Sequence, residues 1–431
     1  MIVYTPSGAL EGRAENGVRI FRGIPYAQAP VGDLRFRAPQ KLAPWEGVRQ
    51  ALTFSPICPQ EEQEPGSFYH KEFYADPAFQ PPMREDCLYL NIWAPEGEGP
   101  FPVAVWFHGG AYLHGFGSEQ EFDGEAYARR GVILVTVNYR LGLFGFFAHP
   151  ELTARDGHSG NYGILDQIAA LEWVRDHIAS FGGDPGNVTA FGQSAGGGSV
   201  HTLVRSPLTR GLIHRAIIQS AGGYKSLLSR KIPLARLEKA AVKFLKDKKL
   251  TLQALTELPA PELLALSKDF QKCGMLCTGS FLPLSPCVDG YVLHESMDDT
   301  LEQQRLLSIP YLLGSTRDDI GVGRAARNDP SKNKLHRSAM EMCFRNNRGG
   351  RPSYCYFFRR QMPGDKAGAF HSSELWYIFG TLHRCWRPLT GADEALSQRM
   401  LRVWTDFMKT GDPGFPPCRE DAPYVEIFDI A

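Results

Sequence analysis

The sequence predicts an α/β fold, with one mostly parallel sheet and helices on both of its faces. Two observations lead to this prediction. From residue 86 onward, short apolar runs that end at glycine or polar residues alternate with helical stretches. The longest helical stretch stops at a Gly-Gly-Asp-Pro signal. With 431 residues and 43% hydrophobic content, the chain can enclose a sizeable core, and we expect one domain over residues 1–431.

The elements before residue 86 have a different pattern. The first fifty residues alternate short β-like runs with glycine and proline turns, as at Val18–Pro25, and predict a small antiparallel sheet. Residues 59–84 are rich in Glu, Pro and aromatic side chains without periodicity, which predicts a long loop.

The main sheet is expected to form from short runs rich in apolar, β-branched and aromatic residues. These runs are Leu88–Trp93, Val103–Phe107, Val132–Asn138, Val188–Phe191, Arg215–Gln219, Ile309–Leu313 and Tyr354–Phe358. Apolar residues three or four positions apart predict a helix over 164–178. Leucines among many Lys and Glu over 226–272 predict a helical insertion that caps the sheet.

Composition excludes several classes of function. Balanced charge, 47 basic against 47 acidic residues, argues against nucleic acid or an anionic membrane as the main partner. No apolar run reaches the roughly 18–20 residues that span a bilayer, and Met1–Thr5 does not resemble a secretory leader. We therefore expect a cytoplasmic protein, or a secreted one if a leader precedes this sequence. Nine cysteines without CxxC spacing predict no metal site and mostly reduced thiols in the core.

The segment Gly192–Gly196, Gly-Gln-Ser-Ala-Gly, has the pattern of a nucleophile elbow with Ser194 at its centre. Chance supplies this pattern in about one such sequence in four, and a plain glycine turn is the alternative. The context favours the elbow, because a predicted strand precedes it and a small-residue helix follows. The backbone N–H of Ala195 would then open a helix, where the helix dipole favours an anion.

A second glycine-rich turn, His108-Gly109-Gly110-Ala111, follows the strand Val103–Phe107. Acyl transfer places negative charge on a carbonyl oxygen, and backbone donors reach that oxygen only where side chains are small or absent. Gly110, Ala111 and Ala195 are therefore the predicted oxyanion hole. His108 is expected to brace this loop and not to act as the base.

Ordered motifs along nearly the whole chain resemble one family, the type-B carboxylesterase/cholinesterase family, in its bacterial carboxylesterase form. The motifs are Phe21–Ala27, Pro30–Phe36, Glu85–Asn91, Asn138–Arg140, Gly160–Gly163, Phe181–Pro185 and Phe407–Pro413. The resemblance implies an α/β-hydrolase fold and a serine carboxylesterase that acts on a small-molecule ester without metal or cofactor. It identifies the family much more closely than the substrate.

In α/β-hydrolases the acid and then the histidine follow the serine along the chain. Only three histidines follow a plausible acid, and of these His371 lies in a loop after the strand Tyr354–Phe358, whereas His383 lies in a helix-like run and His336 precedes that strand. The resemblance also points to His371 as the base. By its position in the family motif, the acid is Asp319, an Asp where Glu is usual, with Asp318 as the alternative.

The resemblance further implies two supporting pairs. Arg140 and Asp166 resemble a buried ion pair, and Cys58 with Cys87 match an N-terminal disulfide, which reducing conditions would keep open.

Two departures from the family concern the substrate. The loop between Cys58 and Cys87 has no Trp to hold a choline group by cation–π contact; its aromatic residues instead either line a wall for bulky acyl groups or only pack the loop. They are Phe68, Tyr69, Phe73, Tyr74 and Phe79. Only 52 positions separate Asp319 from His371 (371 − 319), so the segment 322–352 is short and the site should be open. We therefore expect aryl or other bulky esters, such as hydroxycinnamoyl esters.

Three alternatives remain at this point. A non-catalytic adhesion module of the same fold would lack the chemistry of Ser194. A lipase would need an apolar lid, for which the charged residues 226–272 are poorly suited. An amidase would use the same residues. The sequence leaves the oligomeric state, monomer or dimer, open.

Overall fold

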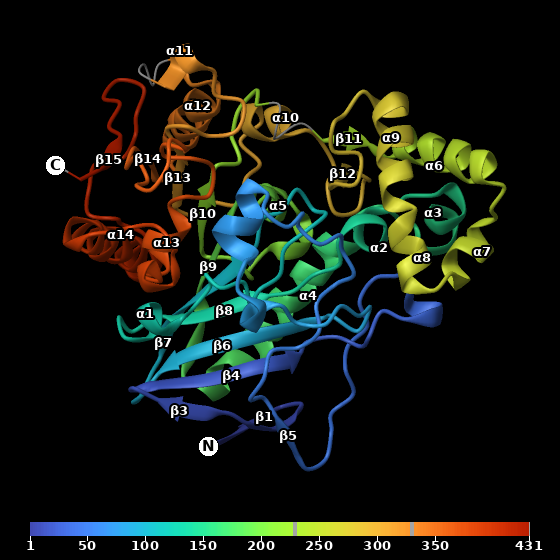
Figure 1. The fold of residues 1–431 in the computed structure, drawn as a ribbon, viewed down its shortest axis with the longest axis horizontal. Helices are drawn as coiled ribbons and strands as arrows, with labels where there is room; N and C mark the ends of the chain where they lie inside the picture. The colour runs from blue at the N-terminus through green and yellow to red at the C-terminus, as the bar shows by residue number, and fades with distance from the viewer. Residues whose placement is uncertain (227–230, 328–331, 431) are drawn as a thin grey trace.

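The computed structural model describes residues 1–226, 231–327 and 332–430, and in these residues a ten-stranded sheet forms the centre of the protein (Figure 1). Its strands, in spatial order, are β15 (Glu426–Phe428), β14 (Ser353–Phe358), β13 (Tyr311–Thr316), β10 (Arg215–Gln219), β9 (Gly183–Gln193), β7 (Phe101–Phe107), β8 (Ile133–Val137), β6 (Tyr89–Pro95), β4 (Val18–Pro25) and β3 (Arg13–Glu15). Neighbouring strands are parallel from β15 to β8. The strands β6, β4 and β3 pair antiparallel beyond them.

The central strands are buried on both faces, as expected for a parallel sheet. Alternate residues of β7 enter two different cores: Val103 and Val105 face one, and Ala104 and Trp106 face the other. The helices α4 (Tyr162–His177), α5 (Ala195–Leu203) and α12 (Lys334–Arg348) supply side chains to the first core. The helices α1 (Glu125–Ala128), α13 (Leu375–Ile378) and α14 (Gly391–Thr410) supply side chains to the second. The predicted α/β architecture is therefore confirmed.

The N-terminal sheet differs from the expected one. It contains β1 (Ile2–Thr5), β2 (Gly8–Glu11) and β5 (Val48–Gln50); β1 and β2 are antiparallel, but β5 joins β2 in parallel. The segment Val18–Pro25 instead belongs to the main sheet. The reason is burial: Phe21 and Ile24 are fully buried and pair with Ile92 and Leu90 of β6.

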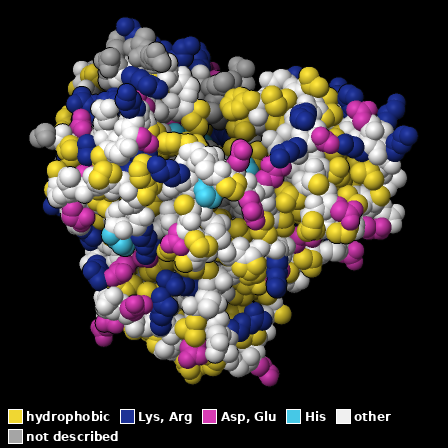
Figure 2. Space-filling view, viewed as in Figure 1, with side chains coloured by type: hydrophobic (Ala, Val, Ile, Leu, Met, Phe, Trp, Pro, Cys, Tyr) yellow, Lys and Arg dark blue, Asp and Glu magenta, His cyan; other side chains and the backbone are white. Residues whose placement is uncertain are grey.

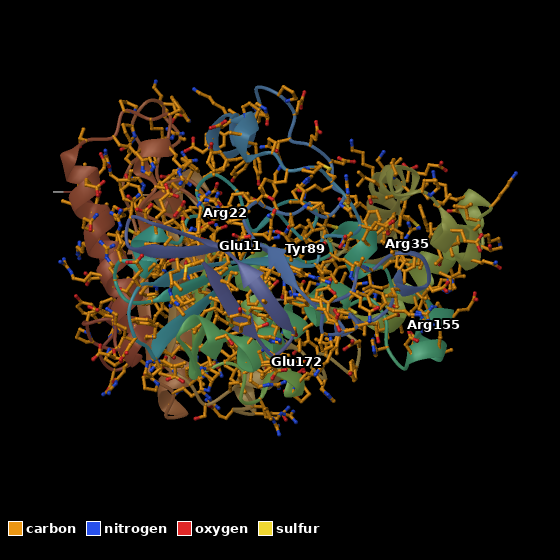
Figure 3. The ribbon with its side chains drawn as sticks, turned by 90° about the horizontal axis from the view of Figure 1, so that it is seen from below. Glu11, Arg22, Arg35, Tyr89, Arg155 and Glu172 are labelled. Atoms are coloured by element: carbon orange, nitrogen blue, oxygen red, sulfur yellow. The ribbon has the colours of Figure 1, made fainter. Side chains whose placement is uncertain are left out.

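Most of the expected insertion is helical. It contains α6 (Leu234–Lys248), α7 (Leu252–Glu257), α8 (Ala260–Ala265) and α9 (Ser267–Thr278), which lie together at the right of Figure 1; residues 227–230 are outside the described residues. Phe244 of α6 packs edge-on against Phe270 of α9 at 5.2 Å. Arg35, seen at the same side in Figure 3, donates hydrogen bonds to the carbonyls of Thr256 and Leu258, and so ties these helices to the N-terminal segment.

Between β13 and β14, where a short segment is expected over 322–352, lie α11 (Arg324–Arg327) and α12; residues 328–331 are outside the described part. The remaining α-helices and strands of the described residues are short. They are α2 (Gly142–Phe146), α3 (Pro150–Asp156), α10 (Met297–Glu302), β11 (Ile232–Pro233) and β12 (Cys287–Val288). Basic and acidic side chains are interspersed on the face shown in Figure 2. Among the described residues, no helix has both the length and the apolar character to cross a membrane.

Candidate active site

A cavity of about 220 Å³ opens where the strands β7 and β9 end. The first residues after these strands contribute to its wall, namely the turn Gly109–Ala111 after β7 and Ser194 after β9. His371 lines the same cavity. Ligands of open α/β sheets bind at the carboxyl ends of the strands, so this cavity lies where the fold predicts a site.

Ser194 sits on a sharp, strained turn between β9 and α5. Its φ of 56° and ψ of −122° lie outside the regions that non-glycine residues usually adopt. The N–H of Ser194 donates a hydrogen bond of 2.9 Å to the carbonyl of Gln219, which fixes the turn against β10. A Cβ on Gly196 would overlap the carbonyl oxygen of Phe107, and one on Gly192 would overlap the backbone of Gly196. The Gly-x-Ser-x-Gly pattern is therefore a steric requirement of this turn.

His371 and Asp319 are directly hydrogen-bonded, with 2.5 Å between His371 Nδ1 and Asp319 Oδ1. The other carboxylate oxygen, Oδ2, accepts from Ser220 Oγ at 2.7 Å and from the N–H of Thr316 at 3.0 Å. Burial alone would raise the pKa of Asp319, but the charge of His371 and these hydrogen bonds outweigh it and lower the pKa. Asp319 is therefore a charged and firmly oriented group.

The same pair sets the protonation of His371. Burial disfavours the imidazolium, but the charge of Asp319, its hydrogen bond and the nearby Glu374 outweigh burial, so the pKa of His371 lies above its usual value. Glu374 is itself fully buried; burial and the charge of Asp319 raise its pKa to about 7. The ring of His371 is thus held by one carboxylate and influenced by a second.

The alternative residues lie outside this arrangement. Asp318 pairs with Arg317 at 2.8 Å and Arg327 at 3.1 Å, and it accepts from the N–H of Ala369. It holds the loop that carries His371 and does not contact the ring. His336 is buried 3.4 Å from Ser315 Oγ, and burial lowers its pKa to about 4. His383 is exposed in a turn after α13.

Ser194 and His371 share the cavity, but within the described residues no hydrogen bond joins them in this conformation. The side-chain nitrogen Nε2 of Gln193 instead lies 3.3 Å from His371 Nε2 and 3.5 Å from His371 Nδ1. Contacts between catalytic groups are often long in unliganded enzymes and tighten only when substrate binds.

The turn after β7 presents backbone donors to the cavity. Gly110 (φ 98°) and Ala111 (φ 56°) both adopt left-handed conformations, and the Gly110 carbonyl accepts from the N–H groups of Leu113 and His114 at 2.9 Å. The N–H groups of Gly110 and Ala111, and that of Ala195 at the start of α5, donate to no other group among the described residues. Gly110 and Ala111 line the cavity, and Ala195 directly follows Ser194, which lines it too.

His108 is buried beneath this turn. It stacks on Tyr139 with ring centroids 4.3 Å apart, and Tyr139 Oη donates to the carbonyl of His108 at 2.8 Å. Burial lowers the pKa of His108 to about 4. It therefore packs beneath the loop as a neutral ring.

Aromatic side chains from the long loop form one wall of the cavity. Tyr69, Phe73 and Tyr74 belong to this wall, and the π-helical turn His70–Tyr74 carries two of them. Phe73 stacks on Trp376 at 5.4 Å, and the Tyr69 hydroxyl lies 3.5 Å from the carbonyl of His371. Phe68 packs on Phe370 and does not line the cavity, and Phe79 lies beneath Arg384.

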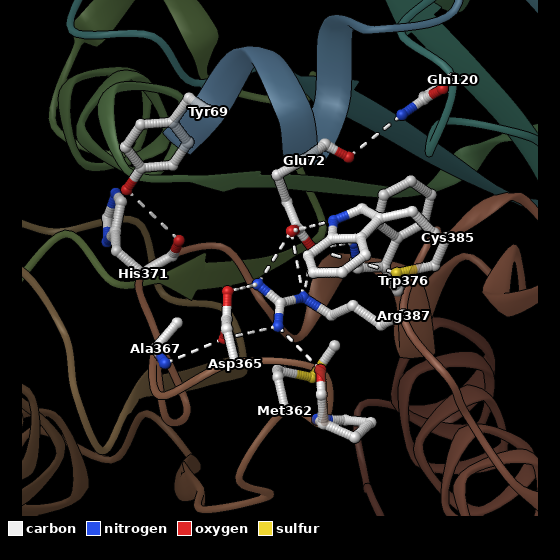
Figure 4. Close-up of polar contacts among 12 residues, drawn as sticks. Tyr69, Glu72, Gln120, Met362, Asp365, Ala367, His371, Trp376, Cys385 and Arg387 are labelled. Atoms are coloured by element: carbon white, nitrogen blue, oxygen red, sulfur yellow. Dashed lines mark hydrogen bonds and ion pairs between the residues drawn. The ribbon is translucent and has the colours of Figure 1, made fainter. Parts of the chain in front are cut away.

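One buried carboxylate, Glu72, anchors this wall to the C-terminal part of the chain (Figure 4). It accepts from Trp376 Nε1 at 3.0 Å, from Trp386 Nε1 at 2.9 Å and from Arg387 Nε at 3.0 Å. The Arg387 side chain is fully buried and also binds Asp365 at 2.8 Å. The turn His70–Tyr74 is therefore held beside His371 by charge-assisted hydrogen bonds.

Of the two supporting pairs, the ion pair forms in the structure and the disulfide does not. Arg140 and Asp166 form a buried ion pair with 2.6 Å between Arg140 Nη2 and Asp166 Oδ1. Cys58 and Cys87 are both buried free thiols, and a hydrogen bond with Cys58 is the main cause that raises the pKa of Cys87. The thiols are thus adjacent but not bonded here.

Several groups of this site were not predicted from the sequence. Ser220, Gln219 and Glu374 support the His371–Asp319 pair, and Glu72 supports the wall. Ser220 follows β10 directly, so its place after a buried strand could have found it. Glu72 left no such signal, because its partners lie more than 300 positions away.

The sequence of the chain is similar to those of known esterases. A profile of the Carboxylesterase family matches residues 1–347 and 331–424. The para-nitrobenzyl esterase of Bacillus subtilis (strain 168) is 33% identical over 469 aligned positions, which cover 96% of this chain and 90% of that enzyme. A fumonisin B1 esterase of Sphingopyxis macrogoltabida is 39% identical over 336 positions, 75% of this chain and 57% of that enzyme.

Solved structures give the same result. A structure of a PNB esterase superposes with a TM-score of 0.86 at 31% identity, over 100% of this chain and 96% of that one. A thermophilic PNB esterase gives 0.85 at 32% identity, over the same shares. The fold and its relatives thus define a carboxylic-ester hydrolase of the α/β-hydrolase fold. The chain belongs to the Carboxylesterase family, and the resemblance drawn from its motifs is confirmed.

Proposed function

We propose that the chain hydrolyses carboxylic esters through an acyl-enzyme on Ser194, with His371 as the general base and Asp319 as its orienting acid. The observation that carries the proposal is the 2.5 Å hydrogen bond between Asp319 and His371 beside the cavity that Ser194 lines. Asp319 would hold the ring so that Nδ1 keeps its proton and Nε2 is free to accept one.

The reaction follows from these positions. His371 Nε2 accepts the Ser194 proton while Oγ attacks the ester carbonyl. The oxyanion forms against the N–H groups of Gly110, Ala111 and Ala195, and one such donor is worth about 10²–10³ in rate. His371 then protonates the leaving alkoxide, and the alcohol departs. Water, deprotonated by His371, attacks the acyl carbon and regenerates Ser194 with release of the acid.

For the substrate we propose aryl and other bulky esters, with hydroxycinnamoyl esters as one class. The aromatic wall of Tyr69, Phe73 and Tyr74 offers stacking surfaces next to Ser194. We further infer that the segment 322–352 is short and leaves the site open, which agrees with the same proposal. The family profile matches in two parts that overlap at residues 331–347, within the segment expected to be short. The alignment with the Bacillus subtilis esterase spans 469 positions, more than the 431 residues of this chain.

A fluorophosphonate probe tests the proposed nucleophile. We expect it to label the wild-type protein and not Ser194→Ala; a wild-type protein that stays unlabelled and inactive would instead indicate a binding module.

Substrate preference is tested by kcat/KM for methyl ferulate against methyl butyrate. Equal or faster turnover of the short linear ester would contradict the proposed preference for bulky acyl groups.

A further inference from the structure

A second cavity, of about 250 Å³, lies between the end of α5 and the segment around α10, and it shares no lining residue with the active-site cavity. Its lining is basic. Arg205, Arg210 and Arg305 contribute to it with His294, and Glu295 is the acidic residue among the described lining residues. The ester chemistry proposed above makes no use of this cavity.

Arg205 carries a charge that the protein leaves uncompensated. Its Nε donates to the carbonyl of His201 at 2.9 Å, but Nη1 and Nη2 are buried and have no hydrogen-bond partner among the described residues. Other buried arginines are paired, as in Arg140–Asp166 and Arg387–Glu72. A buried charge without a partner is strongly destabilising, so this guanidinium needs a counter-charge.

The carboxylates near Arg205 are engaged elsewhere. Glu295 pairs with Arg305, and Asp298 accepts from the N–H of Lys225 at 2.8 Å. Burial lowers the pKa of Arg205 to about 10, although Tyr112, Glu295 and Asp298 act in the opposite direction. Burial and then the charge of Arg205 lower the pKa of the neighbouring Lys231 to about 7. The region is therefore short of negative charge.

We propose that this cavity binds a compact polyvalent oxyanion, either a phosphate group or a polycarboxylate. Arg205 lines the cavity, but its two free Nη groups are covered, so binding requires the guanidinium to turn toward the cavity. Its planar fork then matches two oxygens of such an anion. Arg210, exposed at the same cavity, supplies a second positive charge. A monovalent anion would leave one of these two charges uncompensated.

Calorimetry and thermal unfolding of the full chain test the proposal, with inorganic phosphate, citrate, and sodium chloride at matched ionic strength. We expect phosphate or citrate to raise Tm beyond the effect of sodium chloride. The ligand that binds more tightly shows whether the cavity prefers a phosphate group or a polycarboxylate. Arg205→Met removes the buried charge, so it should keep the fold and lose the anion response. Arg205→Lys, which keeps the charge without the fork, should weaken binding at least about tenfold.

Arg129→Gln is the matched control, because Arg129 is an exposed arginine that directly follows α1 and pairs with Glu125. It should respond to phosphate and citrate as the wild type does. The proposal is overturned if neither anion exceeds the effect of sodium chloride, or if Arg205→Met binds as tightly as the wild type. A response lost equally in Arg129→Gln would also overturn it, because general surface charge would then be the cause.

Discussion

At Ser194 the backbone is strained, and two glycines make that strain tolerable. Gly196 approaches the carbonyl of Phe107, and Gly192 approaches Gly196, so no side chain fits at either position. The close approach brings α5 against the end of β7, next to the turn Gly109–Ala111. The geometry that exposes Ser194 thus also brings the backbone donors to the same cavity.

Gly196→Ala should therefore disrupt the site. Its Cβ must displace the Phe107 carbonyl, so we expect a loss of about 1–3 kcal/mol in the free energy of unfolding and a fall in kcat/KM of at least about 10². Urea unfolding and ester hydrolysis measure the two effects. Gly391→Ala is the control, since nothing lies within 4 Å of a Cβ there. Wild-type activity in Gly196→Ala would refute the steric account of the turn.

The pKa of His371 predicts a pH profile. His371 must be neutral to accept the Ser194 proton, so kcat/KM should fall as pH drops through its pKa. Because that pKa is raised above the usual 6.5, the acid limb should lie above pH 6.5. A profile of kcat/KM from pH 5 to 9 measures it, and a limb below 6.5 would contradict the effect of Asp319 on the ring.

Asp319→Asn should change both the rate and the profile. Removing the negative charge leaves burial as the main influence on His371, so the acid limb should move to lower pH. Without the Asp319 carboxylate, the His371 ring should also hold its proton on the wrong nitrogen, which should lower kcat by about 10⁴-fold. Asp318→Asn is the comparison, because Asp318 binds arginines and does not contact the ring. A larger loss of kcat in Asp318→Asn than in Asp319→Asn would show that Asp318, and not Asp319, is the acid that orients His371.

At the scale of elements, the turn His70–Tyr74 is held by contacts distant in the sequence. Glu72→Gln should leave the buried Arg387 with Asp365 as its one carboxylate partner among the described residues, and destabilise the fold by about 3–5 kcal/mol. The aromatic wall should then loosen, so kcat/KM for a bulky aryl ester should fall at least about tenfold more than for an acetate ester.

Asp393→Asn separates this effect from lost stability. It breaks another buried pair, Arg360–Asp393 at 2.7 Å, which touches no residue of the wall. We expect it to lower Tm and to reduce the kcat/KM of both esters alike. If the ratio of kcat/KM for the aryl ester to kcat/KM for the acetate ester is the same in Glu72→Gln and Asp393→Asn, Glu72 has no specific part in substrate selection.

At the scale of the whole molecule, elements that local pattern defines could be predicted. The helix expected over 164–178 appears as α4 (Tyr162–His177), and the run Val103–Phe107 lies in β7, which begins two residues earlier at Phe101. The turn at Ser194 lies between a strand and a helix as predicted, because its glycines have a local steric role. The short run Ile309–Leu313 is shifted to Tyr311–Thr316, since pairing with β14 sets its ends.

Features that depend on tertiary contacts could not be predicted. Val18–Pro25 gave no sign of joining the large sheet, because its partner β6 lies some seventy positions further along the chain. The long loop has no periodicity, yet His70–Tyr74 forms a helical turn there because Glu72 binds Trp376 and Arg387. Glu374 is likewise defined only by its place beside Asp319 and His371. The catalytic roles of Ser194, Asp319 and His371 stay predictions.

The most direct measurement is rapid-quench mass spectrometry of the enzyme turning over a p-nitrophenyl ester. The account predicts a peptide containing Ser194 that gains the mass of the acyl group, together with a burst of nitrophenol. Ser194→Ala should show neither the adduct nor the burst. Steady turnover by Ser194→Ala, or an acyl group on a different residue, would contradict the account.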